Sequence, residues 1–408
     1  MSIYDDALKL HREKKGKISI ESKVDVKNAE DLSLAYSPGV AEPCRQIKEN
    51  PESIYEYTTK GNLVAVVSTG TAVLGLGDIG PEASLPVMEG KAVLFKKFAG
   101  IDAFPLCVGT KDVDRVVKFV KLLEPTFAGI NLEDIAAPQC FEIEDRLKKE
   151  TNMAIFHDDQ HGTAIVVLAG ITNALRLVQK ELEKVRIVVN GAGASATSVV
   201  KLLLKAGAST ENIIVCDSRG ALYEGRNNMN DAKKELASIT NSQNIEGDLN
   251  RVIEDSDIFI GLSVGNVMNE KMVKKMKTDP IVFALANPTP EIDPDRAKKA
   301  GAKIIATGRS DYPNQINNVL AFPGVFRGAL DVRSREINER MKIAAGKAIA
   351  DLIKDKIKAD YIIPDPFDRR VAPEVASAVA RAAIDTGAAR VEKSTEEIKE
   401  NTKKLTEI

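Results

Sequence analysis

Two adjacent carboxylates, Asp158 and Asp159, stand in the middle of the chain within the run 157–163, His-Asp-Asp-Gln-His-Gly-Thr. The apolar stretch 165–178 follows and predicts a buried helix. Paired carboxylates at the start of such a helix cost solvation free energy unless a cation or a reacting proton offsets them. The pair therefore predicts a hinge that carries chemistry, with a divalent metal as the simplest offset.

A second acidic pair, Glu133 and Asp134, comes after a predicted strand that ends near Asn131 and before a predicted helix over 135–150. Acids in a first helical turn are also favoured by the helix dipole, so a purely structural role is the alternative. Together with Asp159 they supply three carboxylates. Such a set of oxygen ligands selects Mg²⁺ or Mn²⁺.

The spacing of His157 and His161 also resembles that of an i,i+4 zinc helix. Gly162, directly after the second histidine, weakens a continuous helix there. The available upstream partners are carboxylates, which zinc favours less. We therefore prefer a magnesium or manganese site.

A lysine and a tyrosine are candidates for proton transfer. Lys91 shares the face of a predicted helix over 85–98 with an apolar stripe made of Val87, Leu94, Phe95 and Phe98. On a buried face its amine either pairs with an acid or loses its proton more easily, as a general base must. The alternative is a lysine that buries only its aliphatic carbons and keeps its ammonium group in solvent. Tyr36 precedes the turn at Pro38-Gly39, where an ordinary surface tyrosine would also fit.

A dinucleotide fingerprint lies in the second half of the chain. A strand over 185–190 leads into a glycine turn, a helical stripe follows, and a second strand over 213–217 ends in Asp217. This order places a pyrophosphate at the helix N-terminus and an acid near a ribose hydroxyl. Arg219 could instead accept the 2′-phosphate of NADP. The residues of the turn are Gly191, Ala192, Gly193, Ala194, Ser195 and Ala196.

Further strands over 257–262, 281–286 and 303–306 predict a mostly parallel, doubly wound α/β sheet. Asn287 and Asn317-Asn318 follow these strands, where such sheets bind ligands. An earlier loop with Gly75, Gly77 and Asp78 also matches the glycine pattern, but Pro81 and Pro86 spoil a strand-turn-helix. We interpret it as a loop that lines a cleft.

Composition excludes several classes of function. The 408 residues contain 57 Lys and Arg against 59 Asp and Glu, so charge favours neither nucleic acid nor an anionic membrane. The four cysteines, Cys44, Cys107, Cys140 and Cys216, have no CxxC spacing, which fits a reducing cytoplasm. No signal peptide and no uninterrupted apolar run of about 18 residues is found.

Taken in order, these motifs resemble those of malic enzymes, of the short prokaryotic type, over about residues 30–390. The motifs that carry the resemblance are Tyr36-Ser-Pro-Gly-Val, Gly75-Leu-Gly-Asp78-Ile-Gly, Glu-Gly-Lys91, Asn-Leu-Glu133-Asp134, His-Asp158-Asp159-Gln-His-Gly-Thr, the 191–196 turn, Ala-Asn287-Pro and Asn317-Asn318-Val.

The resemblance implies oxidative decarboxylation of L-malate to pyruvate and CO₂ with NAD or NADP and Mg²⁺ or Mn²⁺. It implies Tyr36 as general acid and Lys91 as general base, with Asp158 supporting the lysine. It further implies metal binding by Glu133, Asp134 and Asp159, and contacts of Asn287 and Asn318 with malate or nicotinamide. Large forms carry an arginine where this chain has Ala72, so substrate carboxylate binding uses another group.

We expect a substrate and metal domain over 1–160, a dinucleotide-binding domain over 161–330, and a helical segment over 331–408 that packs on both. We also expect a homodimer or a larger homo-oligomer in the cytoplasm. Two alternatives remain open. One is a metal-dependent 2-hydroxy acid dehydrogenase that stops at the keto acid, and the other is a dinucleotide-sensing binding protein without turnover.

Overall fold

Two parallel sheets form the body of the molecule in this computed structural model, which describes residues 2–73 and 75–406. The first sheet has four strands in the order β2-β1-β3-β4. Its strands are β1 (Leu63–Ser68), β2 (Asp102–Cys107), β3 (Gly129–Glu133) and β4 (Ala154–His157). The strand predicted to end near Asn131 is β3. Pro105 interrupts the apolar run of β2, and β4 has only four residues, so neither was predicted from the sequence.

The second sheet has six strands in the order β10-β9-β8-β5-β6-β7, all parallel except the short β7. Since β5 lies between β6 and β8, the order reverses on either side of it, as in the predicted doubly wound fold. The strands are β5 (Ile187–Asn190), β6 (Ile213–Asp217), β7 (Gly220–Ala221), β8 (Ile258–Gly261), β9 (Ile281–Ala284) and β10 (Ile304–Thr307).

Each helix next to a sheet buries an apolar face of its own. α8 (Thr163–Val178) is apolar almost all round, and eleven of its sixteen residues are buried. α5 (Gly80–Ala99) begins five residues earlier than predicted and keeps Pro86 inside. Its buried face carries Met88, Ala92, Phe95 and Ala99, whereas Val87 is exposed. The other helices beside the sheets are α6 (Val113–Leu122), α7 (Gln139–Glu150), α9 (Ala194–Lys205), α10 (Asp231–Ile239), α11 (Leu249–Val252), α12 (Glu270–Lys275) and α13 (Pro294–Lys299).

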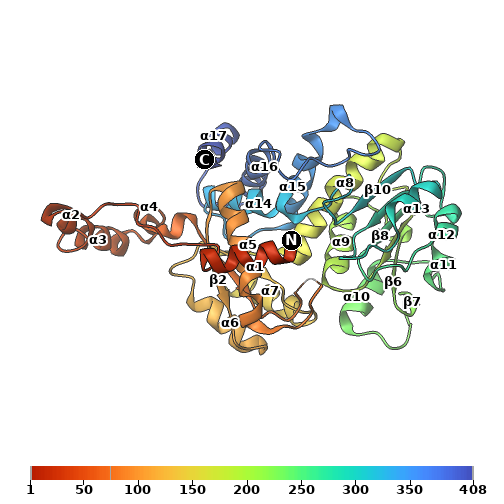
Figure 1. The fold of residues 1–408 in the computed structure, drawn as a ribbon, viewed down its shortest axis with the longest axis horizontal. Helices are drawn as coiled ribbons and strands as arrows, with labels where there is room; N and C mark the ends of the chain where they lie inside the picture. Colours follow the sequence, from red (N-terminus) through yellow and green to blue (C-terminus); the bar gives the residue numbers. More distant parts are fainter. Residues whose placement is uncertain (1, 74, 407–408) are drawn as a thin grey trace.

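Four helices at the C-terminal end pack on one another and on helices beside the sheets (Figure 1). α15 packs on α8, while α14 and α17 pack on α5. α17 is amphipathic, because Ile398 and Thr402 are fully buried while most of its charged side chains are exposed. The four helices are α14 (Phe322–Asp331), α15 (Glu339–Asp351), α16 (Val371–Asp385) and α17 (Thr395–Thr406).

An N-terminal arm projects away from this body (Figure 1). It follows α1 (Ile3–Lys14) and carries α2 (Ala29–Ala35), α3 (Ala41–Glu49) and α4 (Ile54–Tyr57). Neither α2 nor α3 has a buried residue. Residues 18–26, between α1 and α2, form neither helix nor strand. The arm leaves apolar side chains in solvent, namely Ile20, Val24, Val26, Leu32, Leu34, Tyr36 and Val40.

One helical run in the described part of the chain, Asp158–Val178, is long and apolar enough to cross a membrane. It comprises α8 and the turn before it. Both α9 and α15 pack against α8, and most of the run is buried inside the molecule.

Candidate active site

Lys91 lies between two carboxylates at the carboxyl end of the first sheet. Its Nζ atom is 2.6 Å from Oδ2 of Asp158 and 2.8 Å from Oε1 of Glu133. All three side chains are nearly buried, and the ring centroid of Phe322 is 4.3 Å from the ammonium nitrogen. The structure therefore brings the predicted lysine and two of the predicted acids together.

Strand pairing explains why these acids meet. β3 ends at Glu133 and β4 ends at His157, and the two strands are parallel neighbours. Residues just beyond the strand ends therefore lie at one edge of the sheet. Asp134 follows β3 in a left-handed conformation (φ 52°), and its amide donates a 2.8 Å hydrogen bond to Oδ2 of Asp159.

Burial and mutual repulsion make the acids hard to ionise. The pKa of Glu133 is raised to about 8, and the pKa values of Asp134 and Asp159 are raised to about 7. Burial is the largest cause for each, and neighbouring carboxylates add to it. For Lys91, burial lowers the pKa, but Asp158 and Glu133 together outweigh it and hold the pKa above its usual range. Of the two outcomes expected for a buried lysine, pairing with an acid and easier loss of the proton, the structure shows the pairing.

The donor set fits a hard divalent cation. Four carboxylates face one ammonium group, and Oδ2 of Asp134 and Oδ1 of Asp158 are buried without a hydrogen-bond partner. Such oxygens suit Mg²⁺ or Mn²⁺. Within 2–73 and 75–406, however, no group of three or more His, Cys, Asp or Glu side chains is already arranged to hold a metal. Glu133 is turned instead toward Lys91 and Asn131, 2.8 Å from each.

The two histidines do not form a zinc pair. Residues 158–162 form a π-helical turn, η3, so His157 and His161 are not one turn apart on a regular helix. His157 is fully buried with its Nδ1 atom 3.7 Å from Asp159, whereas His161 contacts Glu144 and Lys342. Burial lowers the pKa of both histidines to about 4.

Asn318 belongs to this site, as predicted. Its amide nitrogen lies 3.2 Å from Oδ2 of Asp158, and its carbonyl oxygen accepts from the Thr163 hydroxyl at 3.2 Å. Gly162 leaves room for the carboxylate, because a Cβ atom there would lie 1.9 Å from Oδ1 of Asp158. Asn287 follows β9, and its amide nitrogen lies 2.6 Å from the position a Cβ atom would take at Gly308.

Tyr36 is not brought to the lysine within one chain. It caps the C-terminal end of α2 on the arm, 69% exposed, and its backbone hydrogen bonds join Leu32 and Val40 of the same arm. Figure 1 shows α2 far from α5, the helix that carries Lys91.

The dinucleotide turn meets the acid site directly. Gly191 (φ 133°) leaves room for the carbonyl of Leu262, which a Cβ atom would approach to 2.4 Å. Gly193 faces open space. The hydroxyl of Ser195 donates to the main-chain carbonyl of Asp159 at 2.7 Å, so this side chain holds the acid turn. Ala192 lies in the turn, and Ala194 is the first residue of α9.

Asp217 ends β6 as predicted, but it is not free. Arg226 and Lys233 bind its carboxylate at 2.5 and 2.7 Å, and its pKa lies well below the usual range because these hydrogen bonds outweigh burial. The sequence reasoning missed both cations, which lie nine and sixteen residues further along the chain. Arg219 is exposed.

The first glycine loop stands apart from the dinucleotide turn. Gly75 and Gly77 have positive φ angles beyond the carboxyl end of β1, and Asp78 pairs with Lys111 at 2.5 Å. Ala72 donates its amide to the carbonyl of Asp134 at 3.1 Å. The start of this segment, at Ala72, is therefore joined to the acid site of the first sheet, whereas Asp78 contacts Lys111.

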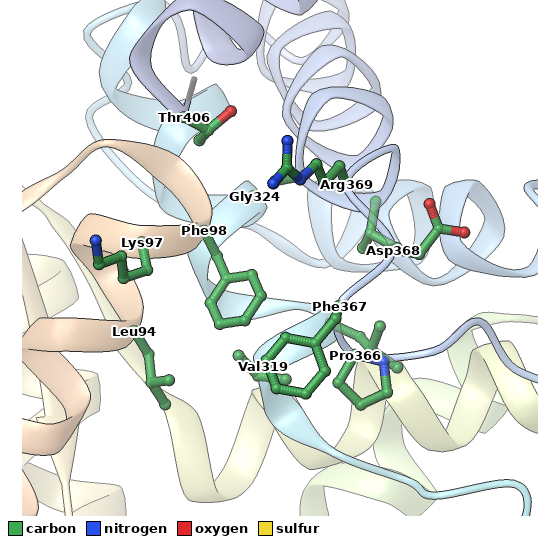
Figure 2. Close-up of a pocket in the computed structure, with 13 residues that line it drawn as sticks. Leu94, Lys97, Phe98, Val319, Gly324, Pro366, Phe367, Asp368, Arg369 and Thr406 are labelled. Atoms are coloured by element: carbon green, nitrogen blue, oxygen red, sulfur yellow. The ribbon is translucent and has the colours of Figure 1, made fainter. Parts of the chain in front are cut away.

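A pocket of about 590 Å³ opens between α5 and the C-terminal part of the chain (Figure 2). Leu94 and Phe98 line it from α5, one and two turns beyond Lys91, and Val319 lines it directly after Asn318. Phe367 faces Phe98 with ring centroids 5.9 Å apart and is 78% exposed. Lys97 and Arg369 stand at its edge.

Known proteins similar to this chain agree on one family. The family model for the malic enzyme N-terminal domain matches residues 14–148, and that for the malic enzyme NAD binding domain matches residues 160–384. The chain is 61% identical to the bifunctional malic/malolactic enzyme of Bacillus subtilis (strain 168), with 100% of both chains covered. It is 55% identical to the NAD-dependent malic enzyme of Geobacillus stearothermophilus, covering 92% of this chain and 78% of that one.

Solved structures agree with these matches. The malic enzyme from Pyrococcus horikoshii Ot3 superimposes with a TM-score of 0.96 at 46% identity, over 100% of this chain and 96% of that one. The NAD-dependent malic enzyme from Thermotoga maritima gives 0.89 at 50% identity, over 92% and 99% of the two chains.

Proposed function

The chain belongs to the malic enzyme family, and on this premise we propose how its own residues carry out the oxidative decarboxylation of L-malate. The resemblance seen in the motifs is thereby confirmed, as are the α/β fold and the use of a nicotinamide dinucleotide. The observation that carries the mechanism is the contact of Lys91 with Asp158 and Glu133.

Glu133, Asp134 and Asp159 would hold the divalent cation, Mg²⁺ or Mn²⁺. The unpaired Oδ2 atom of Asp134 and the crowding of these three carboxylates support this role. When bound, the cation makes the C2 hydroxyl of malate more acidic and polarises the C2 carbonyl, and the nicotinamide accepts the hydride from C2.

Lys91 takes the proton of the C2 hydroxyl in this proposal. With Glu133 and Asp158 both on its ammonium group, the lysine stays protonated. It becomes a base when Glu133 turns toward another cation and only Asp158 still orients the amine. Asn318, which contacts Asp158, and Asn287 would orient malate or the nicotinamide.

Tyr36 protonates C3 after CO₂ has left, but from a second copy of the chain. The arm presents this tyrosine in solvent, away from the lysine of its own chain. Its exposed apolar side chains suit burial in a homodimer. Each site would then combine Lys91 of one copy with Tyr36 of the other.

We assign that arm to the pocket lined by Leu94 and Phe98 of α5, the helix that carries Lys91. Its apolar wall matches Leu32 and Leu34 of α2. The two cations at its edge outnumber the single acid, Asp368, and so match the acids in the first turn of α2. Docking there would bring the tyrosine at the end of α2 to α5.

Both NAD and NADP are proposed as cofactors. Asp217 suits a free ribose hydroxyl, but Arg226 and Lys233 already compensate its charge. With Arg219 nearby, a 2′-phosphate therefore meets net positive charge. We further propose that the enzyme acts in the cytoplasm, in keeping with four free cysteines.

Initial rates with L-malate test these assignments. Reduction of NAD and NADP is measured with Mn²⁺ and after EDTA, together with release of CO₂. Dinucleotide reduction without CO₂ would instead favour a 2-hydroxy acid dehydrogenase, and no turnover would favour a sensor. Full activity in EDTA would contradict the metal site.

A further inference from the structure

His161 joins the acid turn to two distant helices. It lies in η3, two residues beyond Asp159, and its side chain is 13% exposed. Its Nε2 atom is 2.8 Å from the carboxylate of Glu144 on α7, and its Nδ1 atom is 3.0 Å from Nζ of Lys342 on α15. The mechanism above uses none of these three groups.

The partners fix the tautomer of the imidazole. A carboxylate only accepts, so Nε2 carries the hydrogen and donates to Glu144, while Nδ1 accepts from the Lys342 ammonium group. Lys342 is 1% exposed and also pairs with Glu339 at 2.7 Å, and Glu144 also pairs with Lys148 at 2.8 Å. Two carboxylates balance two ammonium groups around a neutral ring.

The opposite side of the turn is held by α9. Ser195 donates to the carbonyl of Asp159, and the Ser198 hydroxyl donates to the side-chain oxygen of Gln160 at 3.2 Å. The turn is therefore anchored from both sides. Without the histidine, the turn would keep its anchor on α9 and lose the one on α7 and α15.

We propose that Glu144, His161 and Lys342 form a positioning relay that fixes the orientation of Asp158 and Asp159 for metal binding. This inference rests on the proposed metal site. Residues that hold metal ligands in place by hydrogen bonds, without touching the metal, typically contribute about 10- to 100-fold in metal affinity. The relay acts through the turn and touches neither substrate nor cofactor.

The test measures Mn²⁺ affinity by calorimetry and NAD affinity by fluorescence. His161→Leu removes both bonds and should weaken Mn²⁺ binding by about 10- to 100-fold, with NAD binding within about threefold of wild type. His161→Gln keeps one donor and one acceptor and should restore most of the loss. Lys342→Met should weaken Mn²⁺ binding about tenfold, and it tests the relay even if His161→Leu fails to fold.

A matched control separates positioning from general destabilisation. Asn173 on α8 is fully buried and donates to the carbonyls of Ala350 and Ile362, far along the chain. Asn173→Leu should lower the melting temperature and leave Mn²⁺ affinity unchanged.

The relay is refuted if folded His161→Leu or Lys342→Met binds Mn²⁺ like wild type. Failure of His161→Gln to restore affinity refutes it as well, and so does an equal loss in Asn173→Leu. If the wild-type protein itself binds no Mn²⁺, the proposed metal site fails instead.

Discussion

The hydroxyl of Ser195, in the first turn of the dinucleotide-binding helix, donates a 2.7 Å hydrogen bond to the main-chain carbonyl of Asp159. A residue of the cofactor loop thus holds a residue of the acid site. Because the bond uses the serine side chain, a cofactor pyrophosphate can be met there by main-chain amides of α9. The two halves of the reaction centre are joined by this contact.

Replacing Ser195 with alanine should therefore affect the metal more than the dinucleotide. A neutral hydrogen bond contributes about 0.5 to 1.5 kcal/mol, so Ser195→Ala should weaken Mn²⁺ binding about two- to tenfold. NAD affinity should change less. Thr197→Val is the control, since the Thr197 hydroxyl bonds within α9, to Gly193. Calorimetric titrations in which NAD affinity falls and Mn²⁺ affinity does not would show that the hydroxyl binds the cofactor.

Cofactor preference should depend on Arg219. If this side chain contacts a 2′-phosphate, the charge-assisted bond contributes about 1.5 to 3 kcal/mol. Arg219→Ala should then raise the KM for NADP about tenfold or more and leave the KM for NAD nearly unchanged. Lys234→Ala is a matched control, because Lys234 is exposed and pairs with Asp231. An equal loss with both cofactors contradicts the assignment.

The metal-free enzyme should become less stable as the pH rises. The raised pKa values of Glu133, Asp134 and Asp159, about 7 to 8, mean that the folded chain keeps protons which the unfolded chain releases near pH 4. Stability is therefore lost as the pH rises from about 4 to about 8. In EDTA, the melting temperature should be lower at pH 8 than at pH 6, and Mn²⁺ should raise it more at pH 8.

The variant Asp159→Ala is compared with the wild type in the same measurements. It should abolish the turnover that Mn²⁺ restores after chelation, and it should reduce the pH dependence of the melting temperature in EDTA. A melting temperature that does not change between pH 6 and 8 in the metal-free wild type would refute this account.

Parts of this site could be predicted from the sequence, because they depend on local order. Glu133 follows one strand and Asp158 another, and parallel strands end at one edge. The strand, glycine turn and helix around Gly191 are likewise contiguous in the chain. Lys91 was found from its helical spacing, although its actual buried neighbours are Met88, Ala92 and Phe95.

Other parts depend on contacts between distant residues, which no local pattern encodes. Lys342 reaches His161 across 181 positions. The compensation of Asp217 by Lys233 requires α10 to fold back beside β6. The protonation state of Lys91 depends on which acids face it, and this became clear only from the geometry.

Mixing two impaired variants should restore activity if Tyr36 acts across a dimer. Tyr36→Phe and Lys91→Ala, refolded together in equal amounts, should give half hybrid dimers, each with one intact site and one doubly altered site. About one quarter of wild-type activity is expected from a two-fold symmetric pair. If the tyrosine served its own chain, the mixture would show no gain over the separate variants.

The last prediction separates the two proton transfers. Lys91→Ala removes the base for oxidation, so malate oxidation should fall by about 10² to 10⁴, with partial rescue by small amines. Tyr36→Phe leaves the lysine and the acids in place but removes the acid that protonates C3. Enolpyruvate can still leave and ketonise in water, so this variant should form reduced cofactor and CO₂ slowly while losing proton exchange at C3 of pyruvate. The measurement is tritium exchange into pyruvate, in parallel with oxaloacetate reduction. If Tyr36→Phe exchanges protons normally while Lys91→Ala reduces oxaloacetate normally, the two roles are wrongly assigned.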